Sequence, residues 1–312
     1  MSQLFSLRSL ASFGMCIAIA VPSIAQPSSL SLSNFSYCQI PNQSGFSLQQ
    51  FTLATWFRPT GPGENGGGTL ISKSGLPLQG ILLGSWWLGW GGATGRVSGM
   101  VVHQIGQSGR FITSTSTVGI NQWAHAALTF DGSTIRLYVN GVLESTEPFN
   151  FPSVYVGPEP VKIGSFNDGT GYTFNHFEGN LDEVAIWNRP LSADEVARLA
   201  SCTPASETNG LVVYLPFTDS SLADASGNNR NAGAVGSPTF GANAPAAITC
   251  CDDIDFNNNG VFPEDQDVID FFNVLAGADC PACNDIDFNN NSVFPEDQDV
   301  IDFFNVLAGG TC

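Results

Sequence analysis

The stretch WAHAALTFDGSTIRLYVNG, which runs from Trp123 to Gly141, decides the fold of this chain. It contains two runs of β-forming side chains, and each run ends in a turn dipeptide, Asp131-Gly132 and then Asn140-Gly141. These dipeptides favour the tight turns of β-hairpins because their backbones adopt positive φ angles easily. The stretch therefore predicts consecutive antiparallel strands.

The same alternation of short β-like runs and turn residues extends over about residues 30–200. A further run, Gln50–Phe57, ends at a proline-containing turn, and one helical stretch is expected at Ser192–Leu199. Ser192 is suited to cap this helix, and Glu195 completes a capping box. Many short strands with one helix predict a mostly β protein, a two-sheet antiparallel sandwich.

Four motifs in a fixed order carry a family resemblance: Phe51-Thr-x-x-x-Trp56-x-x-Pro59, Trp123-x-His125-x-Ala127-x-Thr129-x-Asp131-Gly132, Leu137-Tyr138-Val139-Asn140-Gly141 and Phe177-x-Gly179-x-Leu181-Asp182-Glu183-Val184-x-Ile186-Trp187-Asn188-Arg189-x-Leu191-Ser192. Together they resemble the laminin-G-like, concanavalin A-type jelly-roll family. The resemblance implies a jelly-roll sandwich that often binds glycans or proteins, commonly with a calcium ion near its rim.

Residues 210–244 follow the helix and contain Tyr214-x-Pro216-Phe217. Similar sequence usually opens domains of this family, whereas here it follows the helix. We expect it to supply the closing strands of the same sandwich. A truncated second copy is the alternative, although so short a segment cannot bury a sandwich core alone. We therefore assign residues 27–247 to the sandwich domain.

Negative charge is concentrated at the end of the chain. The 312 residues have a net charge of −18, and residues 250–312 contain 14 of the 28 acidic residues and none of the 10 basic ones. Such a module repels nucleic acid and anionic membranes and attracts cations. The charge pattern therefore argues against a nucleic-acid partner.

Residues 1–25 have the pattern of a secretory signal peptide. Arg8 precedes the apolar run Leu10–Val21, and Ser23 and Ala25 are the small residues expected before a cleavage point. The apolar run is too short for a membrane span, and no other span is expected. We expect a secreted or cell-surface protein.

Two near-identical repeats form the C-terminal module of residues 250–312. Asp253–Cys280 and Asp285–Cys312 have 28 residues each and agree at 25 positions. Each repeat opens with oxygen-bearing side chains at loop positions 1, 3 and 5 and a backbone carbonyl at position 7, a spacing that can surround a hard cation such as calcium. The candidate ligands, including a closing carboxylate, are Asp255, Asn257, Asn259, Val261 and Asp267 in the first repeat and Asp287, Asn289, Asn291, Val293 and Asp299 in the second.

Two frames compete for the closing ligand of each set, because the loop is one residue longer than the standard pattern when Asp267 or Asp299 closes it. Asp267 precedes an apolar stripe with helical period, which places it at the start of a helix. A rival frame begins at Asp253 and closes with Glu264. In the second loop Ser292 replaces the glycine that permits a sharp turn, so the second site should bind calcium more weakly. Asx-rich turns without metal are the alternative interpretation.

This pair of loop–helix units resembles the dockerin family, in particular a cysteine-bracketed variant of bacterial secreted proteins. The resemblance implies a cohesin-like partner. The loop extension at Pro263 and Pro295 departs from the family pattern, and it weakens the expectation of a cohesin partner more than that of calcium binding.

Export makes disulfides favourable, and a disulfide that closes a loop the size of one repeat would stabilise the fold by roughly 3 kcal/mol. We expect one disulfide in each repeat and one across the ends of the sandwich: Cys251–Cys280, Cys283–Cys312 and Cys38–Cys202. Cys250 is left over, so the pairing could shift by one position.

Tryptophans give the best indication of a glycan site, because exposed indoles stack on sugar rings. Trp86, Trp87 and Trp90 lie within five residues, although Trp86 and Trp90 alternate as an inward-facing strand would. Asp168 lies in an Asn-Asp-Gly sequence and is a candidate calcium ligand at the sandwich rim, with a plain turn as the alternative.

A hydrolase of the same fold would need two suitably spaced carboxylates. Asp182 and Glu183 are adjacent, so regular strand geometry would direct them to opposite faces. His125 is expected to be a packed residue, and we identify no catalytic residue. The sequence therefore predicts a secreted, non-catalytic protein that binds a glycan or surface ligand and carries a calcium-binding attachment module. A glycoside hydrolase and a structural envelope or matrix protein are the alternatives.

Overall fold

The computed structural model describes residues 28–33, 35–75, 83–104, 109–167, 173–201, 207–242, 245, 252, 254–288 and 295–308. Several residues for which we have expectations lie outside these ranges: the signal peptide 1–25, Asp168, Cys202, Cys250, Cys251, Asn289, Asn291, Ser292, Val293 and Cys312.

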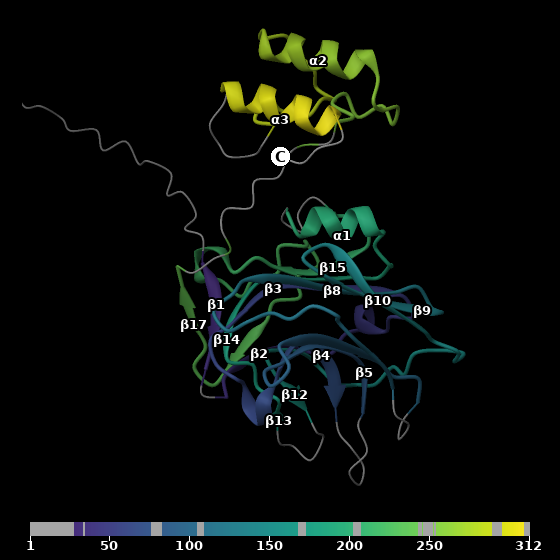
Figure 1. The fold of residues 1–312 in the computed structure, drawn as a ribbon, viewed down its shortest axis with the longest axis vertical. Coiled ribbons are helices and arrows are strands. Elements are labelled where there is room, and N and C mark those ends of the chain that lie inside the picture. Colours follow the sequence, from purple (N-terminus) through teal and green to yellow (C-terminus); the bar gives the residue numbers. More distant parts are fainter. Residues whose placement is uncertain are drawn as a thin grey trace, which may run out of the picture.

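Two antiparallel sheets face each other in the first domain (Figure 1). Sheet A has the strand order β10 (Val142–Pro148), β9 (Thr134–Val139), β8 (Ala124–Phe130), β3 (Phe51–Pro59), β14 (Gly179–Trp187), β1 (Ser29–Leu32) and β17 (Thr239–Gly241), and β15 (Leu211–Leu215) also pairs with β14. Sheet B has the order β16 (Gly233–Val235), β2 (Tyr37–Ile40), β11 (Val161–Ile163), β4 (Gly68–Gly75), β5 (Leu83–Gly91), β6 (Arg96–Val101) and β7 (Arg110–Thr113). A short hairpin of β12 (Phe166–Asn167) and β13 (Thr173–Phe174) contacts β4. The expected two-sheet sandwich is confirmed.

The hairpin predicted from the Trp123–Gly141 stretch is β8–β9, and its partner β10 follows directly. Asn140 and Gly141 both have positive φ, 50° and 78°, as a tight hairpin turn requires. In the preceding turn, the Asp131 carboxylate accepts hydrogen bonds from the backbone N–H groups of Ser133 (2.9 Å) and Thr134 (2.8 Å). The turn residues therefore set the register of three strands.

The sandwich core lies between the sheets and consists of alternate strand residues. Phe51, Leu53 and Phe57 of β3 face inward and are fully buried. Phe51 bridges the sheets, with its ring 5.5 Å from Phe130 of β8 and 5.9 Å from Trp86 of β5. Burying each such side chain contributes roughly 1.5–3 kcal/mol, so this period-2 pattern is the main source of stability.

The helix α1 (Ala193–Leu199) covers the outer face of sheet A, where Val196 and Leu199 pack in one cluster with Trp187. Its predicted cap is confirmed. Ser192 Oγ accepts a hydrogen bond from the N–H of Glu195 (3.2 Å), and the Glu195 carboxylate accepts one from the N–H of Ser192 (2.6 Å). Strands β15, β16 and β17 follow α1 and pair within the two main sheets.

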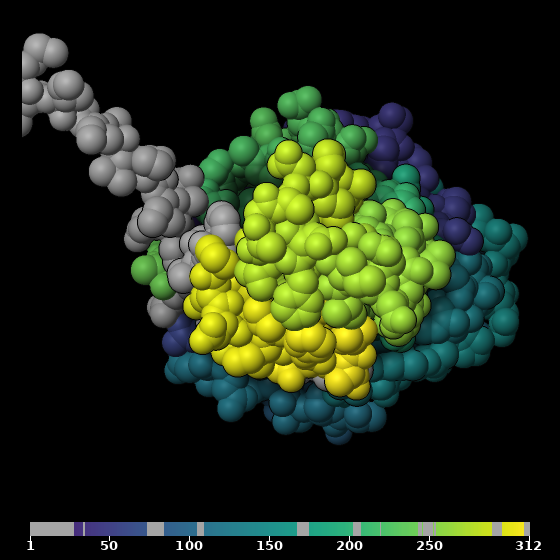
Figure 2. Space-filling model, turned by 90° about the horizontal axis from the view of Figure 1, so that it is seen from above, coloured from purple at the N-terminus to yellow at the C-terminus, as the bar shows by residue number. Residues whose placement is uncertain are grey.

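The C-terminal repeats form a pair of helices, α2 (Asp265–Leu275) and α3 (Asp297–Leu307), which lie side by side (Figure 2). Their common core contains Phe256 and Phe271 from the first repeat and Phe288 and Phe303 from the second. The rings of Phe271 and Phe303 stack at 4.1 Å. Two backbone hydrogen bonds cross between the repeats, from Asn284 N–H to Phe256 O (2.9 Å) and from Asp252 N–H to Phe288 O (2.7 Å). The two repeats therefore fold as one unit.

The cysteine pairing differs from the expected one. Cys280 and Cys283 are bonded to each other, so the expected Cys251–Cys280 and Cys283–Cys312 bonds are wrong. Cys38 is a free thiol buried in the sandwich core on β2, so the expected Cys38–Cys202 bond is wrong as well. Burial raises the pKa of the Cys38 thiol to about 12, which leaves it protonated and unreactive.

Candidate functional site

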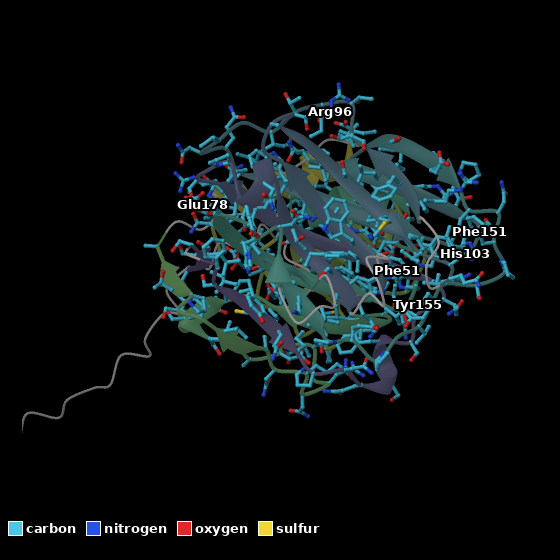
Figure 3. The ribbon with its side chains drawn as sticks, turned by 90° about the horizontal axis from the view of Figure 1, so that it is seen from below. Phe51, Arg96, His103, Phe151, Tyr155 and Glu178 are labelled. Atoms are coloured by element: carbon cyan, nitrogen blue, oxygen red, sulfur yellow. A yellow bond between two sulfur atoms is a disulfide. The ribbon has the colours of Figure 1, made fainter. Side chains whose placement is uncertain are left out.

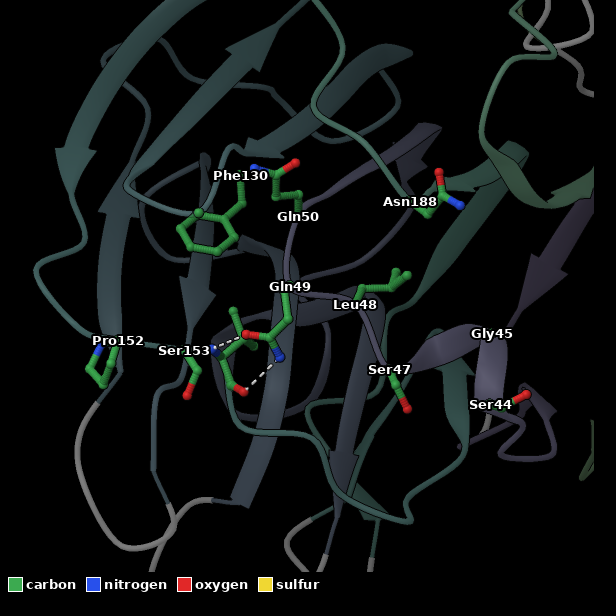
Figure 4. A pocket seen from close by; sticks show the side chains of 12 residues that line it. Ser44, Gly45, Ser47, Leu48, Gln49, Gln50, Phe130, Pro152, Ser153 and Asn188 are labelled. Atoms are coloured by element: carbon green, nitrogen blue, oxygen red, sulfur yellow. Dashed lines mark hydrogen bonds between the residues drawn. The ribbon is translucent and has the colours of Figure 1, made fainter.

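An open groove lies at one end of the sandwich, where β3 begins and β8 ends (Figure 4). It has a volume of about 580 Å³, which is within the range of small-molecule sites. Its lining comes from four separate segments of the chain: Ser44, Gly45, Ser47, Leu48, Gln49, Gln50, Phe130, Gly132, Pro152, Ser153, Val154 and Asn188.

Hydrogen bonds fix the two walls of this groove. The Gln49 side chain bridges to Val154 on the opposite segment, accepting from its N–H (2.9 Å) and donating to its carbonyl (3.1 Å). Gln50 Nε2 donates to the carbonyl of Asp131 (2.7 Å), which leaves its Oε1 available. Backbone groups therefore hold both glutamine side chains in place, and the groove has its shape before a ligand binds.

A buried lysine and an aromatic stack support the segments on either side. Lys73 Nζ donates to Asn42 Oδ1 (2.9 Å) and to the carbonyls of Gly157 (2.8 Å) and Glu159 (2.6 Å), so one ammonium joins the chain before Ser44 to the chain after Val154. Burial lowers the pKa of Lys73 to about 8. Phe151 stacks on His103 with ring centroids 3.8 Å apart at the same edge (Figure 3).

The groove combines an apolar floor with an uncharged polar rim. Leu48, Phe130 and Val154 are buried beneath it, whereas Ser47 and Asn188 are exposed at its rim. None of the lining residues is Asp, Glu, Lys, Arg or His. Hydroxyl and amide groups above an apolar floor suit a neutral ligand that has both C–H and O–H faces.

The three candidate tryptophans have different environments. Trp86 and Trp90 are 0% and 2% exposed and lie in the sandwich core, so the expectation that they contact a ligand is wrong for both. Strand alternation places Trp87 on the opposite, outer face of sheet B, where it is half-buried. Of the three tryptophans, only Trp87 is accessible to a ligand.

The acidic pair Asp182–Glu183 does not follow regular strand geometry. A register shift interrupts β14 between Asp182 and Ala185, and Glu183 has a φ of 51°. The Glu183 carboxylate therefore accepts a hydrogen bond from Tyr214 Oη (2.6 Å) on the outer face of sheet A, the face on which Asp182 lies opposite Trp56. The expectation that the two carboxylates point to opposite faces is wrong, because the bulge removes the alternation.

Burial of this pair changes its protonation. Burial, together with the charge of Glu183, raises the pKa of Asp182 to about 8, and burial raises the pKa of Glu183 to about 7 although the bond from Tyr214 opposes it. His125 lies on β8, which is separated from β14 by β3; it is 1% exposed, as expected for a packed residue, and burial lowers its pKa to about 3. At neutral pH the Asp182 carboxyl is therefore mostly protonated and the His125 imidazole is neutral.

These pKa values predict a stability that falls with rising pH. The folded-state values lie above the unfolded ones, about 3.9 for Asp and 4.3 for Glu. The folded protein therefore binds more protons between about pH 4 and pH 8, and stability present at low pH is lost through that window. We expect Asp182→Asn, which cannot ionise, to reduce the loss between pH 5 and pH 8.5 by about 1–3 kcal/mol in urea unfolding. Equal pH dependence in both proteins would contradict this prediction.

The loop of the first repeat places its predicted ligands next to the start of α2. Both carboxylate oxygens of Asp255 accept hydrogen bonds from the loop backbone, from the N–H of Asn259 (3.0 Å) and of Gly260 (2.7 Å). Gly260 has a φ of 81°, the conformation that favours glycine here. The loop therefore turns around the Asp255 carboxylate.

Asp267 is the third residue of α2 and is completely buried. Its Oδ2 accepts a hydrogen bond from the N–H of Glu264 (3.2 Å), whereas its Oδ1 is buried with no hydrogen-bond partner among the described residues. A buried carboxylate oxygen without a donor is costly unless a cation neutralises it. The described residues contain no cluster of three or more His, Cys, Asp and Glu, so a cation here would also need the asparagine and carbonyl oxygens of the loop.

The second loop repeats this arrangement where it is described. Asp287 and Asp299 are buried, and Asp299 Oδ2 accepts a hydrogen bond from the N–H of Glu296 (3.1 Å). In both repeats a glutamate is the residue before the helix and an aspartate lies three positions later.

Comparison with known proteins gives a family match for the first domain. A family model (Laminin_G_3) described as the concanavalin A-like lectin/glucanases superfamily matches residues 32–197. The rat (Rattus norvegicus) protein named sushi, von Willebrand factor type A, EGF and pentraxin domain-containing protein 1 is 29% identical over 111 residues, which are 34% of this chain and 3% of that protein. The match thus spans a small fraction of the relative's length.

Solved structures resemble the same domain. A Bacteroides ovatus protein proposed to bind carbohydrate has a TM-score of 0.55 and 20% identity, with 72% of this chain and 62% of that chain covered. The CBM40 of the Ruminococcus gnavus IT-sialidase, bound to α2,3-sialyllactose, has a TM-score of 0.45 and 16% identity, with 56% of this chain and 99% of that chain covered. The Bacteroides ovatus structure supports the fold assigned above.

Proposed function

Because this chain belongs to the concanavalin A-like lectin/glucanases superfamily, we propose that it is a secreted, non-catalytic protein whose sandwich binds a neutral carbohydrate. The groove at the start of β3 is the site we propose. A protein of similar fold is one proposed to bind carbohydrate, which supports this class of ligand.

The uncharged lining of the groove is the observation that carries this proposal. Saccharides present alternating hydroxyl groups and C–H patches, and the groove offers hydroxyl and amide groups above Leu48, Phe130 and Val154. A glycoside hydrolase would need two carboxylates beside its substrate, and none of the lining residues has one. Binding without hydrolysis therefore fits the groove better.

Filling the groove tests the proposal. Ser47→Trp places an indole at the exposed rim, and we expect it to weaken binding of saccharides found on a glycan array by roughly tenfold or more, about 1.4 kcal/mol. Ser237→Trp is the matched control, because Ser237 is an exposed loop residue outside the groove lining. Binding that is unchanged in Ser47→Trp, measured by calorimetry, would argue against this groove as the site.

We further propose that the C-terminal pair of helices binds two calcium ions, one in each loop. In the first loop the ligands would be Asp255, Asn257, Asn259, the Val261 carbonyl and Asp267, and the unpartnered Oδ1 of buried Asp267 supports this assignment. The equivalent set in the second loop is Asp287, Asn289, Asn291, the Val293 carbonyl and Asp299. When bound, the cation would neutralise the buried carboxylates and close the loop onto the helix.

The role of this module is attachment in our proposal, either to a cohesin-like partner or as a stalk. The described residues contain no helix that is both long and apolar enough to cross a membrane. A further calcium ion at the sandwich rim, near Asp168, stays a prediction for residues that the structure does not describe. Envelope fractionation of the native organism would distinguish a released protein from one attached at the surface.

A further inference from the structure

Trp87 has a geometry that core packing alone does not explain. A Cβ atom added at Gly89 would lie 2.2 Å from Trp87 Cζ2, 2.7 Å from Cε2 and 2.9 Å from the carbonyl oxygen of Gly68 on β4, so the indole rests directly on the glycine backbone. Its Nε1 donates a hydrogen bond to Thr69 Oγ1 on the neighbouring strand (2.9 Å). The ring is therefore held flat on the outer face of sheet B by a glycine beneath it and a hydrogen bond at its edge.

Hydroxyl groups continue from this ring across the sheet. Gly89 pairs with Ser98 of β6, and Ser98 pairs with Thr113 of β7, which places all three on the same face. The two hydroxyl oxygens are 3.1 Å apart, and Thr113 is exposed. Arg96 follows on the same face, and its guanidinium donates to the carbonyl of Ser114 (2.6 Å). Hydrogen-bonding groups therefore border the ring on the side opposite Thr69.

An exposed ring lies in the same cross-strand row as the half-buried Trp87. Trp87 pairs with Met100 of β6, and Met100 pairs with Phe111 of β7, which is 52% exposed. Two strand spacings separate the Cα atoms of Trp87 and Phe111, about 9–10 Å. A short oligosaccharide spans such a distance, whereas a monosaccharide does not.

We propose that this face of sheet B is a second carbohydrate-contacting surface, in which Trp87 stacks on a pyranose ring of a neutral β-linked oligosaccharide. The Ser98 and Thr113 hydroxyls would bind its hydroxyl groups, and Phe111 would contact a further sugar. A flat indole matches the C–H face of a β-linked pyranose, whose hydroxyl groups project from the ring edge. The surface shares no residue with the groove, so the inference does not depend on the function proposed for the groove.

Gly89→Ala keeps every aromatic ring but displaces the indole, and Trp87→Ala is tested beside it because the added Cβ would also press on the Gly68 carbonyl. We expect calorimetry with a panel of cellohexaose, xylohexaose, laminarihexaose and chitohexaose to give at least one binding event that Gly89→Ala and Trp87→Ala each weaken roughly tenfold or more. Gly233→Ala is the matched control, because a Cβ at this sheet B position meets no atom closer than 3.9 Å. Circular dichroism and urea unfolding of Gly89→Ala should show a folded protein.

Three outcomes would overturn the inference. The first is that no oligosaccharide of the panel binds the full-length protein. The second is that Gly89→Ala and Trp87→Ala, both folded, bind as the unmodified protein does. The third is that Ser47→Trp in the groove abolishes all binding, which would support the groove as the single site. If Ser47→Trp has no effect while the Trp87 variants lose binding, the groove proposal fails and the Trp87 surface stands.

Discussion

Replacing Asp267 by asparagine is expected to remove one of two calcium-binding events, with an affinity loss of roughly 100-fold at the first loop. The change preserves the shape of the side chain but removes the charge of a completely buried carboxylate, one oxygen of which has no hydrogen-bond partner among the described residues. Calorimetry on the full chain, after treatment with a chelator, measures the number of sites directly.

Asp265→Asn is the matched control because Asp265 lies two residues earlier on the same helix and is exposed. It removes the same charge from the module and should leave both events nearly unchanged. The event that persists in Asp267→Asn should be the weaker one, because Ser292 replaces the glycine in the second loop. Two unaltered sites in Asp267→Asn would contradict the ligand assignment, and no heat with the unmodified protein would contradict calcium binding itself.

Replacing Phe271 by alanine should unfold the C-terminal module while the sandwich stays folded. Phe271 is fully buried, stacks on Phe303 and contacts Phe256, and a Phe→Ala change at such a site costs about 3–5 kcal/mol. A module of about 60 residues has little stability in reserve. Hydrogen exchange followed by mass spectrometry should show loss of protection in α2 and α3 but not in the β strands.

Phe272→Ala provides the control, because this neighbouring phenylalanine is 42% exposed and lies outside the central cluster. We expect it to cost less than about 1 kcal/mol. Added calcium should partly restore the Phe271→Ala module, since a ligand at 100 times its Kd stabilises the folded state by about 2.7 kcal/mol. Equal protection of α2 in both variants would show that the stacked pair is not central to the module.

Local sequence signals predicted the strands and helices well because each depends on residues close in the chain. Turn dipeptides fixed the β8–β9–β10 arrangement, and the Ser192–Glu195 pair marked the start of α1. Side chains of a strand alternate between its two faces, so Trp87 points away from the face that Trp86 and Trp90 share. The outward ring was therefore identifiable from this alternation alone.

Features that depend on distant residues were not predictable in the same way. The groove brings Ser47, Gly132, Ser153 and Asn188 together, and no motif links these positions in the sequence. Equal spacing suggested one disulfide within each repeat, but spacing carries no information on which thiols meet, and Cys280 pairs with Cys283. The bulge at Glu183 was missed because an irregular φ leaves no signature in residue type.

The shared phenylalanine core of the two repeats has a consequence for how such a module can be gained or lost. Phe256 and Phe271 of the first repeat share one buried cluster with Phe288 and Phe303 of the second, and backbone hydrogen bonds cross between the repeats. A truncation that removed residues 285–312 would leave a peptide with half a core, open to proteases. A gene duplication or deletion that leaves a folded module must therefore add or remove both repeats together.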